Sequence, residues 1–345
     1  MPRITFDRFD GGLMLARPSS VAPANSLNKM VNMDVQPGGW LRSRAKWKIP
    51  NGGFTIPNQW KGLESNAGYL WTFSAWNVAS TGLTSAVVNT DNGDRLVYAF
   101  RSTGTGGDFA DAVTARLMGV TRWENGFLTV LSTDGGTNCY PTLFSVNTTT
   151  HTVTATNVTD VNMPKTGIMV TATARVYAIA DDGQTVKFCK VGDPSDWTTA
   201  GDAGFLPISQ HFASGQKAYA LGLYQGKLAV FTDQSIQLWT IDPDPTAMAL
   251  DRVIDGTGTR HHGSIVSLYG DLLFLSASGI RSLTTLANSL LPSDVDVGLP
   301  IKSLTSSPVS LTRTANGGVK SSVIALAAGP VSQYWIAAPG QWYRE

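Results

Sequence analysis

The residue types that carry metal and acid–base chemistry are few in this chain and lie far apart. Its 345 residues include only four histidines, namely His151, His211, His261 and His262. The adjacent pair His261 and His262 cannot both project from one face of a strand, and no third ligand follows at the spacing of a zinc site. Phosphate-binding glycine loops and serine-nucleophile motifs are absent from the sequence. We therefore expect no catalytic residue, no metal site and no cofactor.

Carboxylates gather in short stretches that have simpler structural explanations. The prolines of Asp242-Pro243-Asp244-Pro245 predict a rigid turn, and Asp294-Val295-Asp296 is a second acidic pair. The run Asn89 to Asp94 weakly suggests a calcium loop but is more typical of a hairpin turn. Glutamate occurs only as Glu64, Glu124 and Glu345, so a glycosidase that uses paired carboxylates would have to rely on aspartate. We do not expect an enzyme.

Two stretches of the chain repeat one another and indicate which elements hold these residues. Each reads as an apolar strand, a tight turn, a second apolar strand, a small polar turn and a third strand. Three apolar positions recur at one offset of 44 residues, as Leu228 with Leu272, Phe231 with Leu275, and Ile236 with Ile280. A period of about 40–50 residues built from short strands is typical of β-propeller blades.

Weaker copies of this unit occur elsewhere and extend the prediction to the whole chain. They begin near Gly68, Trp123, Ala174 and Gln333. The fold class predicted is all-β, a β-propeller of about six blades with an N-terminal basic arm. The last copy stops soon after Trp335, so we expect either an incomplete propeller or a missing strand that the N-terminal region supplies. We expect an arm over residues 1–62, for partner docking and propeller closure, and a propeller body over residues 63–345.

The composition favours strands and excludes several classes of protein. Charged residues make up 15% of the chain, against roughly 25% in a typical globular domain. No stretch approaches the roughly 18–20 apolar residues of a membrane span, and no apolar segment follows the charged N-terminus as in a secretory signal. The two cysteines, Cys139 and Cys189, suggest neither a disulfide framework nor a zinc site. We expect folding in a reducing cytoplasm and no membrane partner.

Positive charge is concentrated at the start of the chain. Residues 1–62 carry a net charge of +6 and the remainder −5. Within the arm, the cations of one stretch alternate as Arg42, Arg44, Lys46 and Lys48, so in a strand they share one face. Leu41, Ala45 and Trp47 then share the other face. The stretch is either a solvated strand face or a docking surface for an acidic partner or for nucleic-acid phosphates.

Two further functions remain open for a propeller of this composition. The run Ser132 to Thr137 resembles the Asp-box turns of sialidase-type propellers, where such boxes are structural. A hydrolase is therefore one alternative, although catalysis in that group needs an arginine cluster and a Tyr/Glu pair. A lectin-like carbohydrate-binding module is another, because ten tryptophans offer rings for sugar stacking. Trp197 and Trp239 are the positions expected to test it.

Several segments together resemble a family of viral proteins. Phe9-Asp10-Gly11-Gly12-Leu13, then Asn32, then Gly39 to Arg44 are similar to the N-terminal signature of the tail nozzle proteins of short-tailed bacteriophages, also called packaged-DNA stabilisation proteins or tail tubular protein B. Gly192 to Trp197 resembles their Gly-Asp-Pro-x-x-Trp phrase. Leu228 to Ile236 and Gly279-Ile280 resemble their blade hairpins.

The resemblance implies a structural virion protein of the tail, made in the host cytoplasm. Such subunits form a ring, usually a homohexamer, that extends the DNA exit channel below the portal and its adaptor, the head–tail connector. They help to retain and eject the genome and hold tail fibres, spikes or a needle. For Arg42, Arg44, Lys46 and Lys48 the resemblance implies contact with the adaptor or with channel DNA. The adaptor is preferred, because a channel should not hold sliding phosphates strongly.

Overall fold

The computed structural model describes residues 117–132, 139–150, 153–213 and 215–288 together with their side chains, and also Asn66. Elsewhere it describes strands by their bounds and pairing alone. These are β1 (Met33–Val35), β2 (Leu41–Ser43), β3 (Trp60–Asn66), β4 (Tyr69–Ala75), β5 (Leu83–Asn89), β6 (Arg95–Ala99), β22 (Thr312–Ala315), β23 (Gly318–Ser321), β24 (Ile324–Ala328) and β25 (Gln333–Ala337).

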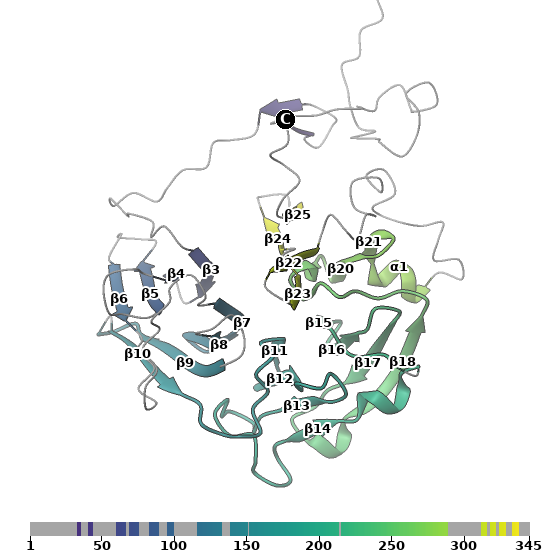
Figure 1. Ribbon diagram of the computed structural model, residues 1–345, viewed down its shortest axis with the longest axis horizontal. Coiled ribbons are helices and arrows are strands. Elements are labelled where there is room, and N and C mark those ends of the chain that lie inside the picture. Colours follow the sequence, from purple (N-terminus) through teal and green to yellow (C-terminus); the bar gives the residue numbers. More distant parts are fainter. Residues whose placement is uncertain are drawn as a thin grey trace, which may run out of the picture. The chain divides into compact units, whose positions relative to one another are not determined.

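The chain folds into consecutive antiparallel sheets, each made from neighbouring strands in chain order (Figure 1). The first four-stranded sheet is β3 to β6. The second contains β7 (Arg116–Trp123), β8 (Gly126–Ser132), β9 (Cys139–Asn147) and β10 (Thr152–Asn157). The third contains β11 (Met169–Ala172), β12 (Arg175–Ile179), β13 (Val186–Phe188) and β14 (Gly204–Leu206). The fourth contains β15 (Ala220–Tyr224), β16 (Lys227–Phe231), β17 (Ser235–Thr240) and β18 (Ala249–Asp255).

A fifth sheet and a few short helices complete the described elements. The three-stranded sheet contains β19 (Val266–Leu268), β20 (Asp271–Ser276) and β21 (Gly279–Ser282). The helices are the 3₁₀ turns η1 (Ile208–His211), η2 (Pro245–Ala247) and η3 (His262–Ser264), and the α-helix α1 (Leu283–Asn288). None of the helices in the described residues is long and apolar enough to span a membrane.

These four-stranded meanders are the blades expected of a propeller, and the all-β class is confirmed. The first strand of one sheet contacts the first strand of the next, β7 with β11 and β11 with β15, as the inner strands of neighbouring blades do. Two apolar cores lie between sheets. Trp123, Val176 and Trp197 belong to one, which joins the second and third sheets, and Phe188 and Trp239 belong to the other, which joins the third and fourth.

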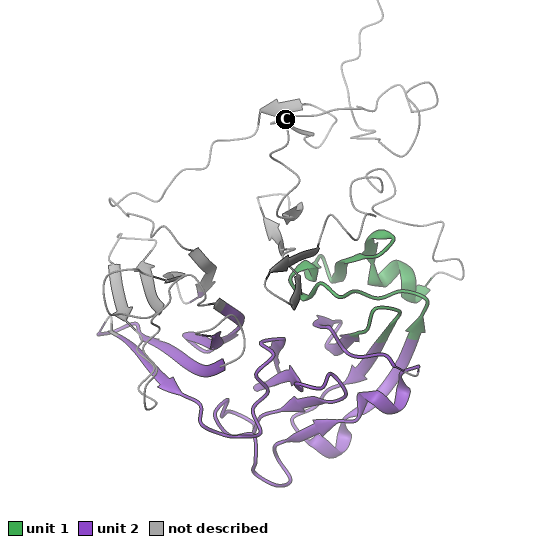
Figure 2. Cartoon of the chain, in the orientation of Figure 1, with its two compact units in different colours: residues 1–48, 231–236, 254–345 green, residues 49–230, 237–253 purple. Residues whose placement is uncertain are grey.

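The chain divides into two compact units (Figure 2). Unit 1 comprises residues 1–48, 231–236 and 254–345, and unit 2 comprises residues 49–230 and 237–253. Within unit 1, the rings of Phe231 and Phe274 meet edge to face with centroids 5.0 Å apart. The amide of Thr259 donates to the carbonyl of Thr232 over 2.8 Å, and this close approach requires glycine at Gly258, where a Cβ would lie 2.1 Å from that carbonyl oxygen.

The repeat predicted at an offset of 44 residues is confirmed strand by strand. The turns Gln225-Gly226 and Tyr269-Gly270 both have positive φ at their two central residues, which is the geometry of the two-residue hairpin turn that matches strand twist. All six repeated apolar positions are buried, namely Leu228, Phe231, Ile236, Leu272, Leu275 and Ile280. The copies predicted near Gly68, Trp123, Ala174 and Gln333 coincide with β4, the β7–β8 hairpin, β12 and β25.

Other expectations have mixed outcomes. The turn predicted at Asp242 to Pro245 is confirmed, since Asp242 accepts the amide of Asp244 over 2.8 Å and Asp244 caps η2 by accepting the amide of Thr246 over 2.9 Å. Both cysteines are free and buried. The boundary predicted at residue 62 falls within β3, and the arm before it is described only in β1 and β2. The stretches 89–94, 133–137 and 294–296 lie outside the residues described with side chains.

Candidate functional site

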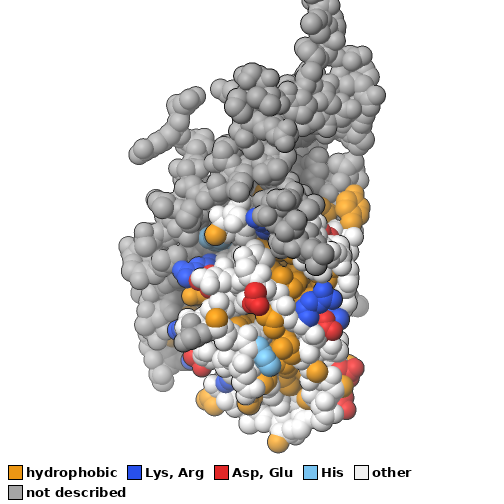
Figure 3. All heavy atoms as spheres, turned by 90° about the vertical axis from the view of Figure 1, so that its right-hand side faces the viewer, with side chains coloured by type: hydrophobic (Ala, Val, Ile, Leu, Met, Phe, Trp, Pro, Cys, Tyr) orange, Lys and Arg blue, Asp and Glu red, His pale blue; other side chains and the backbone are white. Residues whose placement is uncertain are grey.

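An apolar pocket of about 440 Å³ lies in unit 2 between the third and fourth sheets. One wall comes from β13, β14 and η1, and the other from β17 and the segment that runs through η2 into β18. Its apolar side chains include Phe188, Leu206, Trp239, Met248 and Leu250. Figure 3 shows a band of hydrophobic side chains on the face that carries β18. The volume falls within the roughly 300–1,000 Å³ of ligand sites.

Short strands and glycines give the pocket its shape. β13 and β14 pair over three residues, with Phe188 opposite Gly204. A Cβ at Gly204 would lie 2.9 Å from the ring of Phe188, so glycine is required for the ring to pack across β14. After β14, Pro207 is the N-cap residue of η1, whose last residue is His211. His211 is the one titratable side chain that lines the pocket, so the pocket is suited to holding an apolar or aromatic group.

Trp239 forms a fixed wall of the pocket. Its side chain is buried, and its indole N–H donates to Oε1 of Gln237 over 2.9 Å. Gln237 in turn donates from Nε2 to the carbonyl of Ile208 over 3.0 Å. The ring of His211 meets the indole edge to face with centroids 5.8 Å apart. The indole N–H is thus committed to the protein itself, and the ring is held in place as part of the pocket wall.

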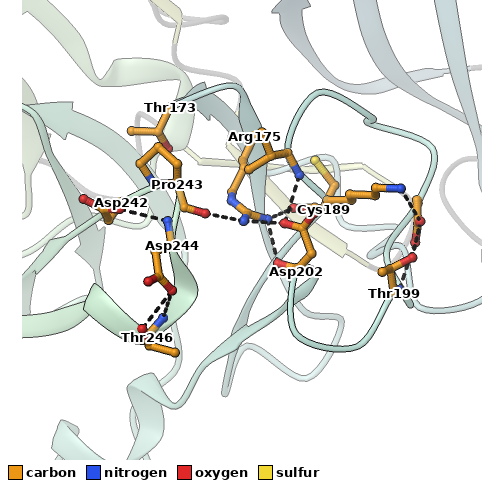
Figure 4. Close-up of polar contacts among 12 residues, drawn as sticks. Thr173, Arg175, Cys189, Thr199, Asp202, Asp242, Pro243, Asp244 and Thr246 are labelled. Atoms are coloured by element: carbon orange, nitrogen blue, oxygen red, sulfur yellow. Dashed lines mark hydrogen bonds and ion pairs between the residues drawn. The ribbon is translucent and has the colours of Figure 1, made fainter.

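A buried arginine ties the two walls of the pocket together (Figure 4). Nη1 of Arg175 donates to the carbonyl of Cys189 over 2.7 Å and to the carbonyl of Asp202 over 2.6 Å. Nη2 donates to the carboxylate of Asp202 over 2.5 Å and to the carbonyl of Pro243 over 2.6 Å. Asp202 precedes β14, and Pro243 precedes η2, so one guanidinium holds both segments that shape the pocket.

The environment of Arg175 explains why the cation is tolerated. Its side chain is fully buried, and a buried charge is costly unless it is paired and hydrogen-bonded. Nη1 and Nη2 donate four hydrogen bonds between them, and the guanidinium lies 5.3 Å from the ring centroid of Phe188. Nε finds no partner among the described residues. Burial raises the pKa of the neighbouring Cys189 thiol to about 11, so this thiol is an inert core group.

Arg175 follows a strained hairpin turn. Thr173 and Ala174 have φ of 49° and 54°, in the left-handed region that disfavours side chains. The hydroxyl of Thr173 lies 3.0 Å from the Tyr177 hydroxyl, and the carbonyl of Ala174 accepts the amide of Gly192 over 2.8 Å. These contacts hold the turn, and β12 begins with Arg175 directly after it.

The phrase Gly192 to Trp197 forms a closed loop before β14. The indole N–H of Trp197 donates to the carbonyl of Pro194 over 2.9 Å, and its side chain is buried in the core between the second and third sheets. The amide of Trp197 donates to the carboxylate of Asp160 over 2.7 Å. Because Asp160 lies in the connection between these two sheets, the loop fastens one sheet to the next.

A second aspartate closes the same loop. Asp196 accepts the amides of Thr198 and Thr199 over 3.1 and 2.9 Å and also the hydroxyl of Thr199. These hydrogen bonds, led by that of the hydroxyl, lower the pKa of Asp196 to about 2, and the charge of Lys190 contributes in the same direction. The loop therefore contains an ionised carboxylate with a structural task.

The predicted docking residues are only partly placed by the structure. Arg42 lies in β2, opposite Asp34 of β1. Arg44, Lys46 and Lys48 lie outside the described residues, so the docking role stays a prediction. In the part of the chain with described side chains, no group of three or more His, Cys, Asp or Glu side chains is arranged to hold a metal ion.

Sequence reasoning missed Arg175 and the pocket that it supports. One signal was present, because Arg175 is a lone charge directly before the apolar run Val176 to Ala180, and such a charge is buried only with partners. Most of its acceptors are backbone carbonyls, and because every residue has one, the residue types do not indicate these contacts. Trp197 and Trp239, considered as sugar platforms, are both buried, and their indoles donate within the protein.

No family model matches this chain, and no curated protein matches it. Among solved structures, it is similar to Kluyveromyces lactis Hsv2, with 10% identity, a TM-score of 0.36 and coverage of 80% of this chain and 86% of that one. It is also similar to Citrobacter koseri AztD, with 9% identity, a TM-score of 0.37 and coverage of 65% and 68%.

A third similar structure is a protein from Lactobacillus plantarum, with 13% identity and a TM-score of 0.37. The alignment covers 62% of this chain and 62% of that protein, so the chain spans less than two thirds of its length. At these TM-scores and identities the likenesses carry no argument about the activity of this chain.

Proposed function

We propose that this chain is a structural subunit of a bacteriophage tail, a nozzle subunit that assembles as a ring around the DNA exit channel. The observation that carries the proposal is the loop Gly192 to Trp197. This phrase is one of those that resemble the tail nozzle proteins. Its side chains fasten one blade to the next, with Trp197 in the inter-sheet core and Asp160 bound to its amide.

The chemistry of the described residues supports a scaffold. Arg175 holds backbone carbonyls, Asp196 closes a loop, and the Cys189 thiol is protonated and buried. The pocket offers apolar walls with one imidazole and pairs no acid with a base. A propeller is a scaffold whose function depends on added sites, and here the ionisable groups near the pocket serve the fold. Trp197 and Trp239 give no support to the carbohydrate-binding alternative, because both side chains are buried and both indole N–H groups donate within the protein.

Electron microscopy of the purified full chain, alone and with the adaptor of the same phage, tests the proposal. We expect six-fold rings with a central opening wide enough for duplex DNA, and the same rings below the capsid in virions. A chain that stays monomeric under both conditions, or that is missing from purified virions, would overturn the proposal. Hydrolysis of chromogenic glycosides by the purified protein would also contradict it.

A further inference from the structure

We propose that the open edge of β14, together with the adjoining pocket, binds residues 44–48 of a second copy of this chain as an added strand. The inference deepens the proposed function by naming a contact that links one subunit to the next. Only the statement that this contact builds a ring rests on the proposed function. The site itself is argued from the edge, the pocket and the alternation of residue types in the segment.

The backbone of β14 is oriented to accept another strand. The amide of Ala180 donates to the carbonyl of Thr185 over 2.9 Å, so Thr185 directs its polar groups toward β12. Along an antiparallel strand, the N–H and C=O groups of successive residues point to opposite sides. The groups of Val186 and Phe188 therefore point toward their β14 partners Leu206 and Gly204. The N–H and C=O of Phe205 therefore point away from β13. Among the described strands, β14 has no neighbour on that side.

The two faces of this edge offer different surfaces. Leu206 packs with Phe188 on the face that forms the pocket. Phe205, which also borders the pocket, lies opposite Lys187 in the register and is 61% exposed. Val161, beside the Asn162 carbonyl that accepts from Lys187 Nζ over 3.0 Å, is 90% exposed. An added strand would alternate its side chains between the pocket and the surface around Phe205.

The edge lacks the charges that usually protect such strands. Natural proteins guard sheet edges with charged side chains to prevent pairing with another chain. β18, the outer strand of the next sheet, carries Asp251, Arg252 and Asp255. β14 is Gly-Phe-Leu and carries no charge. β14 therefore lacks the charged side chains that guard the edge of β18 against pairing with another strand.

The segment 44–48 has the pattern and charge that fit this site. Its sequence Arg-Ala-Lys-Trp-Lys places Ala45 and Trp47 on one face of a strand, for the apolar pocket. Arg44, Lys46 and Lys48 then lie on the other face, where a cation over the exposed Phe205 ring gains a further attraction.

Acidic residues beside the pocket also favour a basic segment. Asp242 and Asp244 do not line the pocket, but they lie in the chain between its lining residues Trp239 and Met248, a stretch without lysine or arginine. A segment of one copy in the pocket of the next is a head-to-tail contact, and contacts of this kind generate rings when the rotation closes.

Peptide binding tests the site without requiring the ring. The receptor is the full chain with Arg44→Ser, Lys46→Ser and Lys48→Ser, which weakens its own segment. The probe is a labelled peptide of residues 41–48, LRSRAKWK, and the control probe is LSAWRRKK, which has the same composition without alternation. We expect fluorescence anisotropy to show binding of the first peptide that is at least about tenfold tighter than that of the second. Equal affinities would overturn the proposal.

Receptor variants test the edge and the pocket separately. Phe205→Pro removes the outward N–H but no hydrogen bond to β13, so we expect the affinity for the peptide to fall about tenfold. Its control, Phe205→Ala, keeps the N–H and therefore retains backbone pairing. If Phe205→Pro fails to fold, Met248→Lys places a cation in the pocket and should abolish binding. Ala247→Lys, exposed and outside the pocket, is its matched control. Unchanged binding in Met248→Lys would contradict the proposal.

Disulfide trapping distinguishes a second copy from other occupants. Mixing full-length Ala45→Cys with full-length Met248→Cys under oxidation should give a covalent dimer, while Arg44→Cys, on the opposite face, should not pair with Met248→Cys. The native thiols are buried and leave this readout clean. Absence of the dimer, or rings that persist in Met248→Lys, would overturn the inference and leave the nozzle proposal standing. A monomeric chain that still binds the peptide would instead remove the nozzle proposal alone.

Discussion

Arg175 shows how a single side chain organises a region that its neighbours in sequence do not predict. Its guanidinium collects the carbonyls of Cys189, Asp202 and Pro243 together with the Asp202 carboxylate. Hydrogen bonds to charged groups are stronger than those between neutral partners. Removing the cation leaves these acceptors without their donor, and the two walls of the pocket lose the group that joins them.

We expect Arg175→Met to destabilise the protein by about 3–5 kcal/mol, the cost of breaking a buried pair by removing one partner. The value should lie toward the lower end, because the Asp202 side chain keeps 32% exposure and gains solvent. Asp202→Asn retains an acceptor and should cost about 1–2 kcal/mol. Urea unfolding at neutral pH measures both changes. An Arg175→Met protein as stable as the original would show that the clamp contributes nothing.

Asp196 predicts a pH dependence of stability in acid. Its folded pKa of about 2 lies below the ordinary value of 3.8, so the unfolded chain binds more protons between these values. The stabilising contribution is therefore complete above about pH 4 and is lost as the pH falls toward 2. Comparing the acid unfolding of the original protein with that of Asp196→Asn should show a smaller loss in the variant over this window. Parallel curves for the two proteins would contradict the assignment.

At the scale of elements, three of the described hairpins share one turn geometry but not the residues that suit it. Gln225-Gly226 and Tyr269-Gly270 place glycine at the second central position, as this turn prefers. Thr173-Ala174 adopts positive φ at both positions without a glycine. The local strain is offset by the contacts of the third sheet, in which β12 continues directly from the turn into the clamp.

We expect Ala174→Gly to stabilise the protein by about 1 kcal/mol, because the left-handed conformation costs a residue with a Cβ about 1–2 kcal/mol and glycine's extra chain entropy takes part of the gain back. Ala174 is exposed, so no packing is lost. The matched control is Ala200→Gly, an exposed turn alanine without positive φ, which should be neutral or destabilising. Thermal unfolding of the two variants gives the comparison, and a lower midpoint for Ala174→Gly than for Ala200→Gly would contradict the strain argument.

At the scale of the whole molecule, the basic N-terminal segment and the uncharged β14 edge are the features that bear on assembly. Replacing Arg42, Arg44, Lys46 and Lys48 by serine changes the charge of the arm and no residue of the two described cores. We expect the circular dichroism spectrum and thermal midpoint to stay unchanged, since exposed charges contribute little to stability, while the fraction of rings falls. Sedimentation velocity measures that fraction. Full ring formation by the quadruple variant would show that the cations serve a different partner, such as the adaptor or DNA.

The fold was predictable wherever the information is local. Alternation of apolar residues, the offset of 44 residues between Leu228 and Leu272 and glycines at hairpin turns all indicated blades, and these strands lie where the pattern predicted. The turn at Asp242 to Pro245 was equally readable, because proline and aspartate act on their own backbone. Such signals depend on neighbours within a few residues, so a sequence displays them directly.

Only the tertiary structure determined the pocket, the open edge of β14 and the role of Arg175. Arg175 and Pro243 are 68 residues apart, and the acceptor at Pro243 is a carbonyl group that every residue possesses, so the residue type gives no sign of the contact. Pocket walls come from two separate sheets, and the orientation of the Phe205 backbone depends on the register of β12, β13 and β14. Long-range pairing decides these features, whereas composition and local pattern determine which segments become strands and turns.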